Sequence, residues 1–297
     1  MDKAIVQIKP WFDKLLFMIG DPGYFGPQSM MWKVNKEITV LFGGARALLM
    51  HAAHPLIAAG ARQTSFYQKD PWKRLIRTLS LQNSVTFGTK EEADESAHRI
   101  NKLHEVIRGD DPISGGYYDA LDHEQLLWVH GCLQISSIYF YEKTVKKLSI
   151  DEKNKYHEEN RLAAKLVLID IDNMPKTHEE LKFWIIEKSR EKNYLLKTDV
   201  AEDVFKIIRG GPVPLHIKPI WPFIAFTAFN TLPKEFKEIY QIKDTKLKNA
   251  IVNLNLLILK YTRPLLPPFF RLIAPARWAK QRITKNPKLK FRDKSNI

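Results

Sequence analysis

Apolar residues recur three and four positions apart along most of the chain, a spacing that places them on one face of an α-helix. The pattern predicts helices over the segments 11–19, 31–60, 71–87, 92–108, 123–147, 152–169, 178–191, 199–209, 221–229, 233–241 and 245–262. No two alternating apolar and polar runs flank an Asn-Gly or Asp-Gly turn, so a β-hairpin is not signalled. The pattern therefore predicts an all-α fold.

Residues that favour helix ends support several of these boundaries. Asp70 precedes a proline at the first helical position, which is typical of a helix start. Thr89 and Glu92 have the spacing of a capping box. Gly60 and Gly109 follow apolar runs, where glycine commonly ends a helix. These signals support the helix starts predicted near residues 71 and 92 and helix ends near residues 60 and 109.

Composition is that of an ordinary globular protein, with 44% hydrophobic and 27% charged residues among 297. This length is enough for one large domain, which we place at residues 1–262. Cys132 is the only cysteine, so no intramolecular disulfide forms and a reducing, cytoplasmic location is expected. Lys9, Pro10, Asp13 and Lys14 interrupt the apolar N-terminus, which is a poor signal peptide and a better amphipathic surface helix.

The net charge of +14 is concentrated near the C-terminus. From Arg263 onward, ten Lys and Arg residues stand against one acid, Asp293, with large apolar residues between them. This mixture suits an anionic membrane surface and predicts a basic C-terminal extension, 263–297, that holds the protein peripherally at a membrane. The alternative is a solvated extension. No nucleic-acid partner is expected, because no nucleic-acid-binding motif accompanies the charge.

Two histidines interrupt the apolar stretch RALLMHAAHPLIAAG. His51 and His54 lie three residues apart and therefore share a helix face, where they suit a ligand or a metal. A zinc protease signature needs a glutamate after the first histidine and the second histidine four positions after the first, and a di-iron bundle needs two Glu-x-x-His motifs. Neither is present, so two core-edge histidines held by hydrogen bonds are the alternative.

The segment DPWKRLIRTLS places two arginines beside apolar residues. Arg74 and Thr78 are four apart and point the same way, while Arg77 directly precedes Thr78. An arginine near a core face requires an anionic partner such as a carboxylate, a phosphate or a haem propionate. A solvated helix face is the alternative.

The helix predicted over 92–108 carries His104 on or at the edge of its apolar stripe and His98 away from it. A histidine in such a position is either a hydrogen-bonded core residue or a ligand, and iron in a porphyrin needs only one protein nitrogen. A structural zinc site is disfavoured because it needs three or four ligands. His130 follows in the next helix, for which Asp122 is the expected N-cap, and suits either the core or a supporting position.

These motifs occur in the order GGARALLMHAAHPLIAAG, DPWKRLIRT, Phe87-Gly88, HEVIRG and YYDALDHEQLLWVHGCL. The chain thus resembles the haem b oxygenases that include latex-clearing rubber oxygenase and the MpaB-type oxygenase of mycophenolic acid biosynthesis. The match extends from about Gly43 to Cys132 and continues weakly to about residue 230. The resemblance implies a globin-like arrangement of helices around one non-covalent haem b.

By motif position, the resemblance implies that His104 is the proximal iron ligand. Arg74 and Thr78 match the family's arginine and threonine on the opposite side of the haem. Arg77 stands where the rubber oxygenases carry a lysine, and arginine stays protonated and is a poor iron ligand. We therefore expect five-coordinate iron or a bound water, with Arg77 hydrogen-bonded to oxygen or to a propionate.

Under this resemblance, His51, His54 and His130 line or brace the haem pocket. The implied activity is the dioxygen-dependent cleavage of a carbon–carbon double bond in a small apolar substrate, isoprenoid or lipid-like. Two alternatives remain, a non-enzymatic haem-binding or sensing protein and a helical scaffold for anionic lipid. Rubber itself is not expected as substrate, because nothing marks the chain for secretion.

Overall fold

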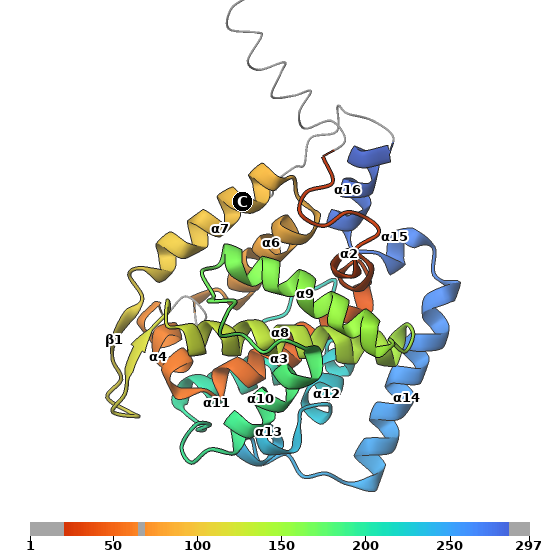
Figure 1. Cartoon of the computed structure of the whole chain (residues 1–297). Helices are drawn as coiled ribbons and strands as arrows, with labels where there is room; N and C mark the ends of the chain where they lie inside the picture. Colours follow the sequence, from red (N-terminus) through yellow and green to blue (C-terminus); the bar gives the residue numbers. More distant parts are fainter. Residues whose placement is uncertain (1–20, 65–68, 285–297) are drawn as a thin grey trace, which may run out of the picture.

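Helices make up nearly all the regular structure of the computed structural model, which describes residues 21–64 and 69–284 (Figure 1). A small antiparallel sheet of two strands is the exception within these residues. The all-α, single-domain prediction is confirmed. The helix predicted over 11–19 lies outside the described residues.

The first part of the described chain contains α2 (Met30–Asn35), η1 (Ile38–Leu41), α3 (Phe42–Ala52), α4 (Pro55–Thr64), α6 (Pro71–Phe87), α7 (Lys90–His104), β1 (Arg108–Asp110), β2 (Tyr117–Asp119) and α8 (His123–Thr144). The second part contains α9 (Ile150–Leu166), α10 (His178–Arg190), α11 (Asp199–Gly210), α12 (Trp221–Asn230), α13 (Lys234–Ile239), α14 (Lys246–Thr262), η2 (Arg263–Leu265), α15 (Pro268–Arg271) and α16 (Ala274–Thr284). Between residues 71 and 262, the predicted helix bounds agree with these to within about four residues.

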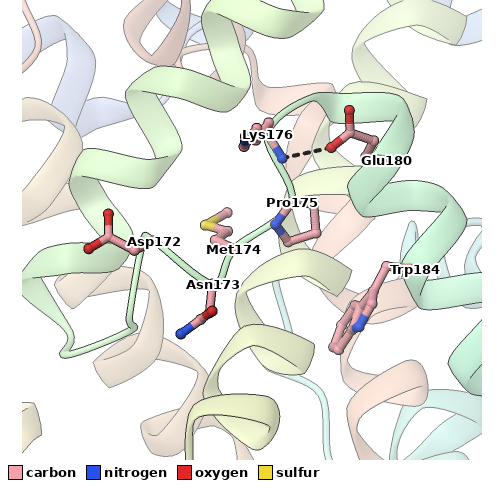
Figure 2. Close-up of a pocket in the computed structure, with 7 residues that line it drawn as sticks. All are labelled: Asp172, Asn173, Met174, Pro175, Lys176, Glu180 and Trp184. Atoms are coloured by element: carbon pink, nitrogen blue, oxygen red, sulfur yellow. Dashed lines mark hydrogen bonds between the residues drawn. The ribbon is translucent and has the colours of Figure 1, made fainter.

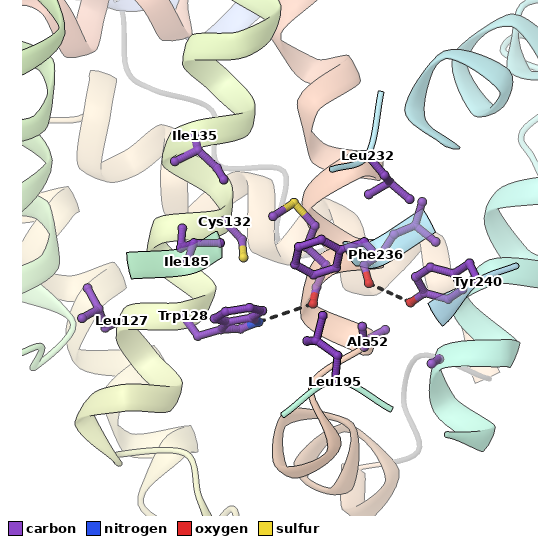
Figure 3. Close-up of a cluster of buried hydrophobic side chains, with 14 of the residues drawn as sticks. Ala52, Leu127, Trp128, Cys132, Ile135, Ile185, Leu195, Leu232, Phe236 and Tyr240 are labelled. Atoms are coloured by element: carbon purple, nitrogen blue, oxygen red, sulfur yellow. Dashed lines mark hydrogen bonds between the residues drawn. The ribbon is translucent and has the colours of Figure 1, made fainter. Parts of the chain in front are cut away.

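Helices α3 and α8 form the centre of the fold, and α9, α10, α11, α12 and α14 surround them (Figure 1). A Cβ at Gly43 would lie only 3.0 Å from the backbone oxygen of Ser136, so glycine permits the close approach of α3 to α8. Trp128 and Leu49 are fully buried where the two helices meet (Figure 3). Removal of this apolar surface from water supplies the main driving force for the fold.

The caps expected at three helices are present. Asp70 accepts a hydrogen bond from the backbone N–H of Lys73 at the start of α6, and Asp122 caps α8 in the same way. Thr89 and Glu92 form the complete capping box of α7. These local signals are reliable because each satisfies backbone N–H groups that the first helical turn leaves unpaired.

The prediction of one helix over 31–60 is wrong. The chain forms α2, η1, α3 and α4 instead, and the axis bends by 101° between the η1–α3 segment and α4. The bend lies at His54, directly before Pro55, where the proline ring disfavours helical backbone for the preceding residue. The apolar period continues across the break because both helices bury residues in the core, and periodicity alone does not reveal the bend.

The helix ends predicted at Gly60 and Gly109 are also wrong. Gly60 lies inside α4, where a Cβ would come within 3.1 Å of the Ile107 side chain. Helix α7 ends at His104, and Gly109 belongs to β1, paired with Tyr118 of β2. The β1–β2 hairpin lacks the two-residue Asn-Gly or Asp-Gly turn by which a hairpin is recognised from sequence. Its longer loop is held by Asp111, which accepts hydrogen bonds from the backbone N–H and hydroxyl of Ser114.

Residues 263–284 pack on the rest of the domain. Arg263 forms two hydrogen bonds of 2.6 and 2.8 Å to the buried carboxylate of Glu37. The backbone N–H of Ile273 donates to Lys36, and the guanidinium of Arg282 donates to the carbonyl of Phe87. The first part of the predicted extension is therefore fixed against α2, η1 and α6, and its remainder lies outside the described residues.

Within the described ranges, no single helix has both the length and the apolar character needed to cross a membrane. Residues 38–52 and 55–64 meet the criteria only as a bent pair. Leu49 and Met50 of this pair are fully buried, as expected of a core helix.

Candidate functional site

His104 is the last residue of α7 and lies half-buried at the open end of the α6–α7 hairpin. Its Nδ1 atom is buried and has no hydrogen-bond partner among the described residues. Burial lowers the pKa of His104, so the imidazole is neutral at neutral pH. A buried neutral imidazole with an unpaired nitrogen has the donor chemistry that binds a transition metal.

Asn101 lies one helical turn before His104 and therefore shares its face of α7. Its side-chain N–H donates to the carbonyl of Leu166 at 3.0 Å, which joins α7 to the end of α9. Its Oδ1 atom is buried and unpaired, like Nδ1 of His104. A ligand bound at this face of α7 would be able to satisfy both atoms. Asn101 is not among the predicted site residues, although its spacing of three from His104 was a usable signal.

Helix α6 contributes Arg74, which is half-buried, and Arg77 and Thr78, which are exposed. Thr78 donates its hydroxyl to the backbone oxygen of Arg74 at 3.1 Å. Arg74 and His104 are separated by nearly the same number of residues from the turn that joins α6 to α7. Because the two helices pack side by side and run in opposite directions, both residues are at the same end of the hairpin (Figure 1).

His51 connects α3 to both α6 and α8. Its Nε2 atom lies 3.0 Å from the carbonyl of Val129, which only accepts, so Nε2 carries the proton and Nδ1 is the acceptor. Burial is the main cause of a lowered pKa of about 4 at His51, and the nearby positive charge of Arg74 lowers it further. Arg74 is therefore close enough to His51 for its charge to affect the pKa of the imidazole.

The side chain of His54 is only 4% exposed and therefore packs among other residues of the fold. Its ring packs against Tyr194 and Trp128, with centroids 4.7 and 5.8 Å away. Its Nδ1 accepts a hydrogen bond from the backbone N–H of Ile57 in the first turn of α4. His54 thus braces the bend between α3 and α4.

His130 on α8 has a buried Nε2 atom without a partner. Burial lowers its pKa to about 4, and the neighbouring His157 lowers it further, against a hydrogen bond with the backbone of Asn160. His157 and Asn160 belong to α9, so the interactions of His130 link α8 to α9. Like His104, His130 is neutral at pH 7 and retains an unsatisfied nitrogen.

A buried polar network that the sequence analysis missed lies between α8, α9 and α10. The side-chain nitrogen of Gln134 is 2.8 Å from Nδ1 of His157 and 3.5 Å from Nδ1 of His178. Nε2 of His157 donates to the carbonyl of Pro175 at 2.7 Å. No sequence pattern marks this network, because its members come from three separate helices. Within the described ranges, no three His, Cys, Asp or Glu residues are arranged to hold a metal.

A surface hollow of about 630 Å³ lies elsewhere, lined by residues 172–176, Glu180 and Trp184. Figure 2 shows the hydrogen bond from the backbone N–H of Lys176 to the carboxylate of Glu180 at the rim of this hollow. None of the predicted site residues lines this hollow. We therefore place the candidate site at the open end of the α6–α7 hairpin, where His104, Asn101 and Arg74 lie.

Comparison with protein families gives a match over residues 32–271 to the family described as "ER-bound oxygenase mpaB/B'/Rubber oxygenase, catalytic domain". Comparison with curated proteins and with solved structures gives no match. The matched range contains every predicted site residue and continues past the predicted boundary at residue 262 into η2 and α15.

Proposed function

Since this chain belongs to the MpaB and rubber oxygenase catalytic-domain family, we propose that it is a haem b-dependent oxygenase that cleaves a carbon–carbon double bond. The proposed substrate is a small apolar molecule, isoprenoid or lipid-like, and dioxygen is the co-substrate. The family supports oxygenase activity, and the residues at the end of the α6–α7 hairpin support the cofactor.

The observation that carries the proposal is the buried, unpaired Nδ1 of His104. An unpaired polar atom in a buried position costs about 1–3 kcal/mol unless a partner satisfies it. A haem iron needs only one protein nitrogen, because the porphyrin supplies the other nitrogen ligands. The residues present therefore fit haem, and His104 would hold the iron.

The other residues of the site would orient the cofactor and set the charge around it. Arg74 supplies a fixed positive charge suited to a propionate carboxylate. His51 stays neutral beside Arg74 and presents Nδ1 as an acceptor, because its proton is held on Nε2 by Val129. Arg77 is exposed, and its guanidinium would suit a propionate carboxylate rather than iron. Bound haem would supply the oxygen chemistry, and the protein supplies binding, orientation and electrostatics.

The first test is haem binding by the purified protein after addition of hemin. We expect a Soret absorption band with one haem per chain, and its loss in H104A because the iron loses its protein ligand. H98A is the matched control, since His98 is exposed on the same helix and should leave the band unchanged. Protein that stays colourless with hemin, or an H104A spectrum identical to that of the unmodified chain, would contradict the cofactor assignment.

The second test concerns the reaction. Reduced, haem-loaded protein should consume oxygen in the presence of polyprenyl compounds or unsaturated lipids and release aldehyde or ketone products. Mass spectrometry of the products identifies the bond that is cleaved. Haem binding with unchanged substrate across the panel would instead support a haem-binding or sensing protein.

A further inference from the structure

Helix α14 has a second apolar face that nothing covers within the described part of the chain. Val252 and Leu256 on its inner face are buried against Phe140 of α8 and the neighbouring helix α12. The outer face carries exposed apolar side chains at alternating spacings of four and three: Leu247, Ile251, Leu254, Ile258 and Tyr261, which are 38–70% exposed. A solvated helix normally carries polar residues there, so this outer stripe indicates an interaction surface.

The exposed apolar surface continues directly beyond α14 into η2 and α15. Leu265 is 81% exposed, and Phe269 and Phe270 are each about 60% exposed. Helix η1 packs beside α15 and adds the exposed side chains of Ile38 and Leu41. We call the outer stripe of α14 and these residues of η1, η2 and α15 the α14–α15 face. It lies along one edge of the molecule, on the side opposite the β1–β2 hairpin (Figure 1).

Positive charge borders the α14–α15 face. Residues 246–284 include eight Lys and Arg residues and no Asp or Glu, so this part of the chain offers no acid of its own to neutralise them. Burial is the main cause of a lowered pKa at Lys36, and Glu37 opposes it. Three cations lower the same pKa further because they lie close by: Arg263, Arg271 and Lys280. Glu37 is already bonded to Arg263, which leaves the cluster with an excess of positive charge.

Arg277 shows how the apolar and cationic residues are combined. Its guanidinium lies 4.1 Å from the ring centroid of Phe269 on α15. Large apolar side chains beside Lys and Arg are the composition that inserts into the boundary between lipid headgroups and acyl chains. The cations then meet anionic phosphate groups while the apolar side chains leave water.

We propose that the α14–α15 face docks the domain on an anionic lipid membrane. A second copy of the chain is disfavoured as the occupant, because it would bring the same excess of positive charge against this face. An anionic lipid surface complements that charge and also receives exposed leucines and phenylalanines without needing a matching groove. The proposal extends the membrane role expected of the extension after residue 263 to α14 and η1, and it does not depend on haem or on oxygenase activity.

Co-sedimentation of the full-length protein with vesicles tests the proposal. We expect binding to phosphatidylcholine vesicles that contain 30% phosphatidylserine, much weaker binding to phosphatidylcholine alone, and loss of binding as salt is raised. The double variant K260E/K280E should bind anionic vesicles about 30-fold more weakly, because each cation near the surface contributes about fivefold. The double variant L254S/L265S should bind about tenfold or more weakly, since both side chains are more than half exposed and would otherwise insert.

The control variant K155E/F183S makes the same types of change on α9 and α10. Both residues are exposed and lie outside the α14–α15 face, so vesicle binding should be unchanged. Equal binding by all variants, or equal binding to neutral and anionic vesicles, would overturn the proposal. Size-exclusion chromatography supplies the other decisive result, because a dimer that L254S/L265S converts to a monomer, with no vesicle binding, would assign the face to self-association.

Discussion

Replacement of Trp128 by alanine is expected to lower the free energy of unfolding by about 3–5 kcal/mol, the range typical of removing a buried tryptophan. Trp128 is completely buried at the centre of the fold (Figure 3). Its ring lies 5.0 Å from Tyr194 and 5.9 Å from Phe236, centroid to centroid, and its N–H donates to the carbonyl of Met50. Alanine would leave a large cavity between α3, α8 and α13, and dense cores close such cavities only in part.

Urea unfolding followed by circular dichroism measures this loss. Trp278 is 39% exposed on α16, so W278A is the matched control and should cost about 1 kcal/mol or less. W128F keeps a ring in the same place and should lose about 1–2 kcal/mol, which keeps the prediction measurable if W128A fails to fold. Similar losses for W128A and W278A would show that Trp128 is not the centre of the core.

The same residue affects the candidate site. Trp128 directly precedes Val129, whose carbonyl fixes the proton of His51, and its ring packs against His54. A change in the packing of Trp128 therefore moves the part of α8 that faces α3. We expect W128F to retain the helical circular dichroism spectrum and to bind haem more weakly than the unmodified chain.

Acidification from pH 7 to pH 5 should destabilise the protein strongly, because several histidines are buried in the neutral form. Burial lowers the pKa to about 4 at His51, His54, His130 and His178. The unfolded chain binds a proton at each with the usual pKa near 6.5, so acid favours the unfolded state. The stability is fully present above about pH 6.5 and is lost as the pH falls towards 4.

His178 allows the contribution of one group to be measured. It is 3% exposed, and a folded pKa of about 4 against an unfolded pKa of about 6.5 corresponds to about 2 kcal/mol lost at pH 5. H178N cannot take up this proton, so its free energy of unfolding should fall by about 2 kcal/mol less than that of the unmodified chain between pH 7 and 5. Urea unfolding at the two pH values gives the difference. H98N removes an exposed histidine, and its pH dependence should match the unmodified chain.

The outcome for H178N also tests the Gln134 network. Gln134 contacts both His157 and His178, and it cannot compensate a positive charge on either ring. If H178N retained the full pH dependence, protonation would be accommodated in the fold without cost. The pKa assigned to His178 would then be wrong.

The sequence by itself determined the helical class, the family and most helix bounds. It did so because helix formation leaves a local record: apolar residues every three or four positions, and capping residues such as Thr89 and Asp122 at the first turn. The family motifs between Gly43 and Cys132 are recognisable for the same reason, since each motif is contiguous along the chain. His104 was identified in this way, and its buried Nδ1 is consistent with the expected role.

Only the tertiary structure decided what depends on residues far apart in the sequence. The break at His54, the hairpin at Gly109 and the interior position of Gly60 follow from packing against other segments, which periodicity does not record. The Gln134 network and the effect of Arg74 on the pKa of His51 arise where separate helices meet. The outer stripe of α14 has the same apolar period as its buried face. The neighbouring helices decide which of these two stripes packs against the core. The exposed stripe therefore became recognisable only after the chain had folded.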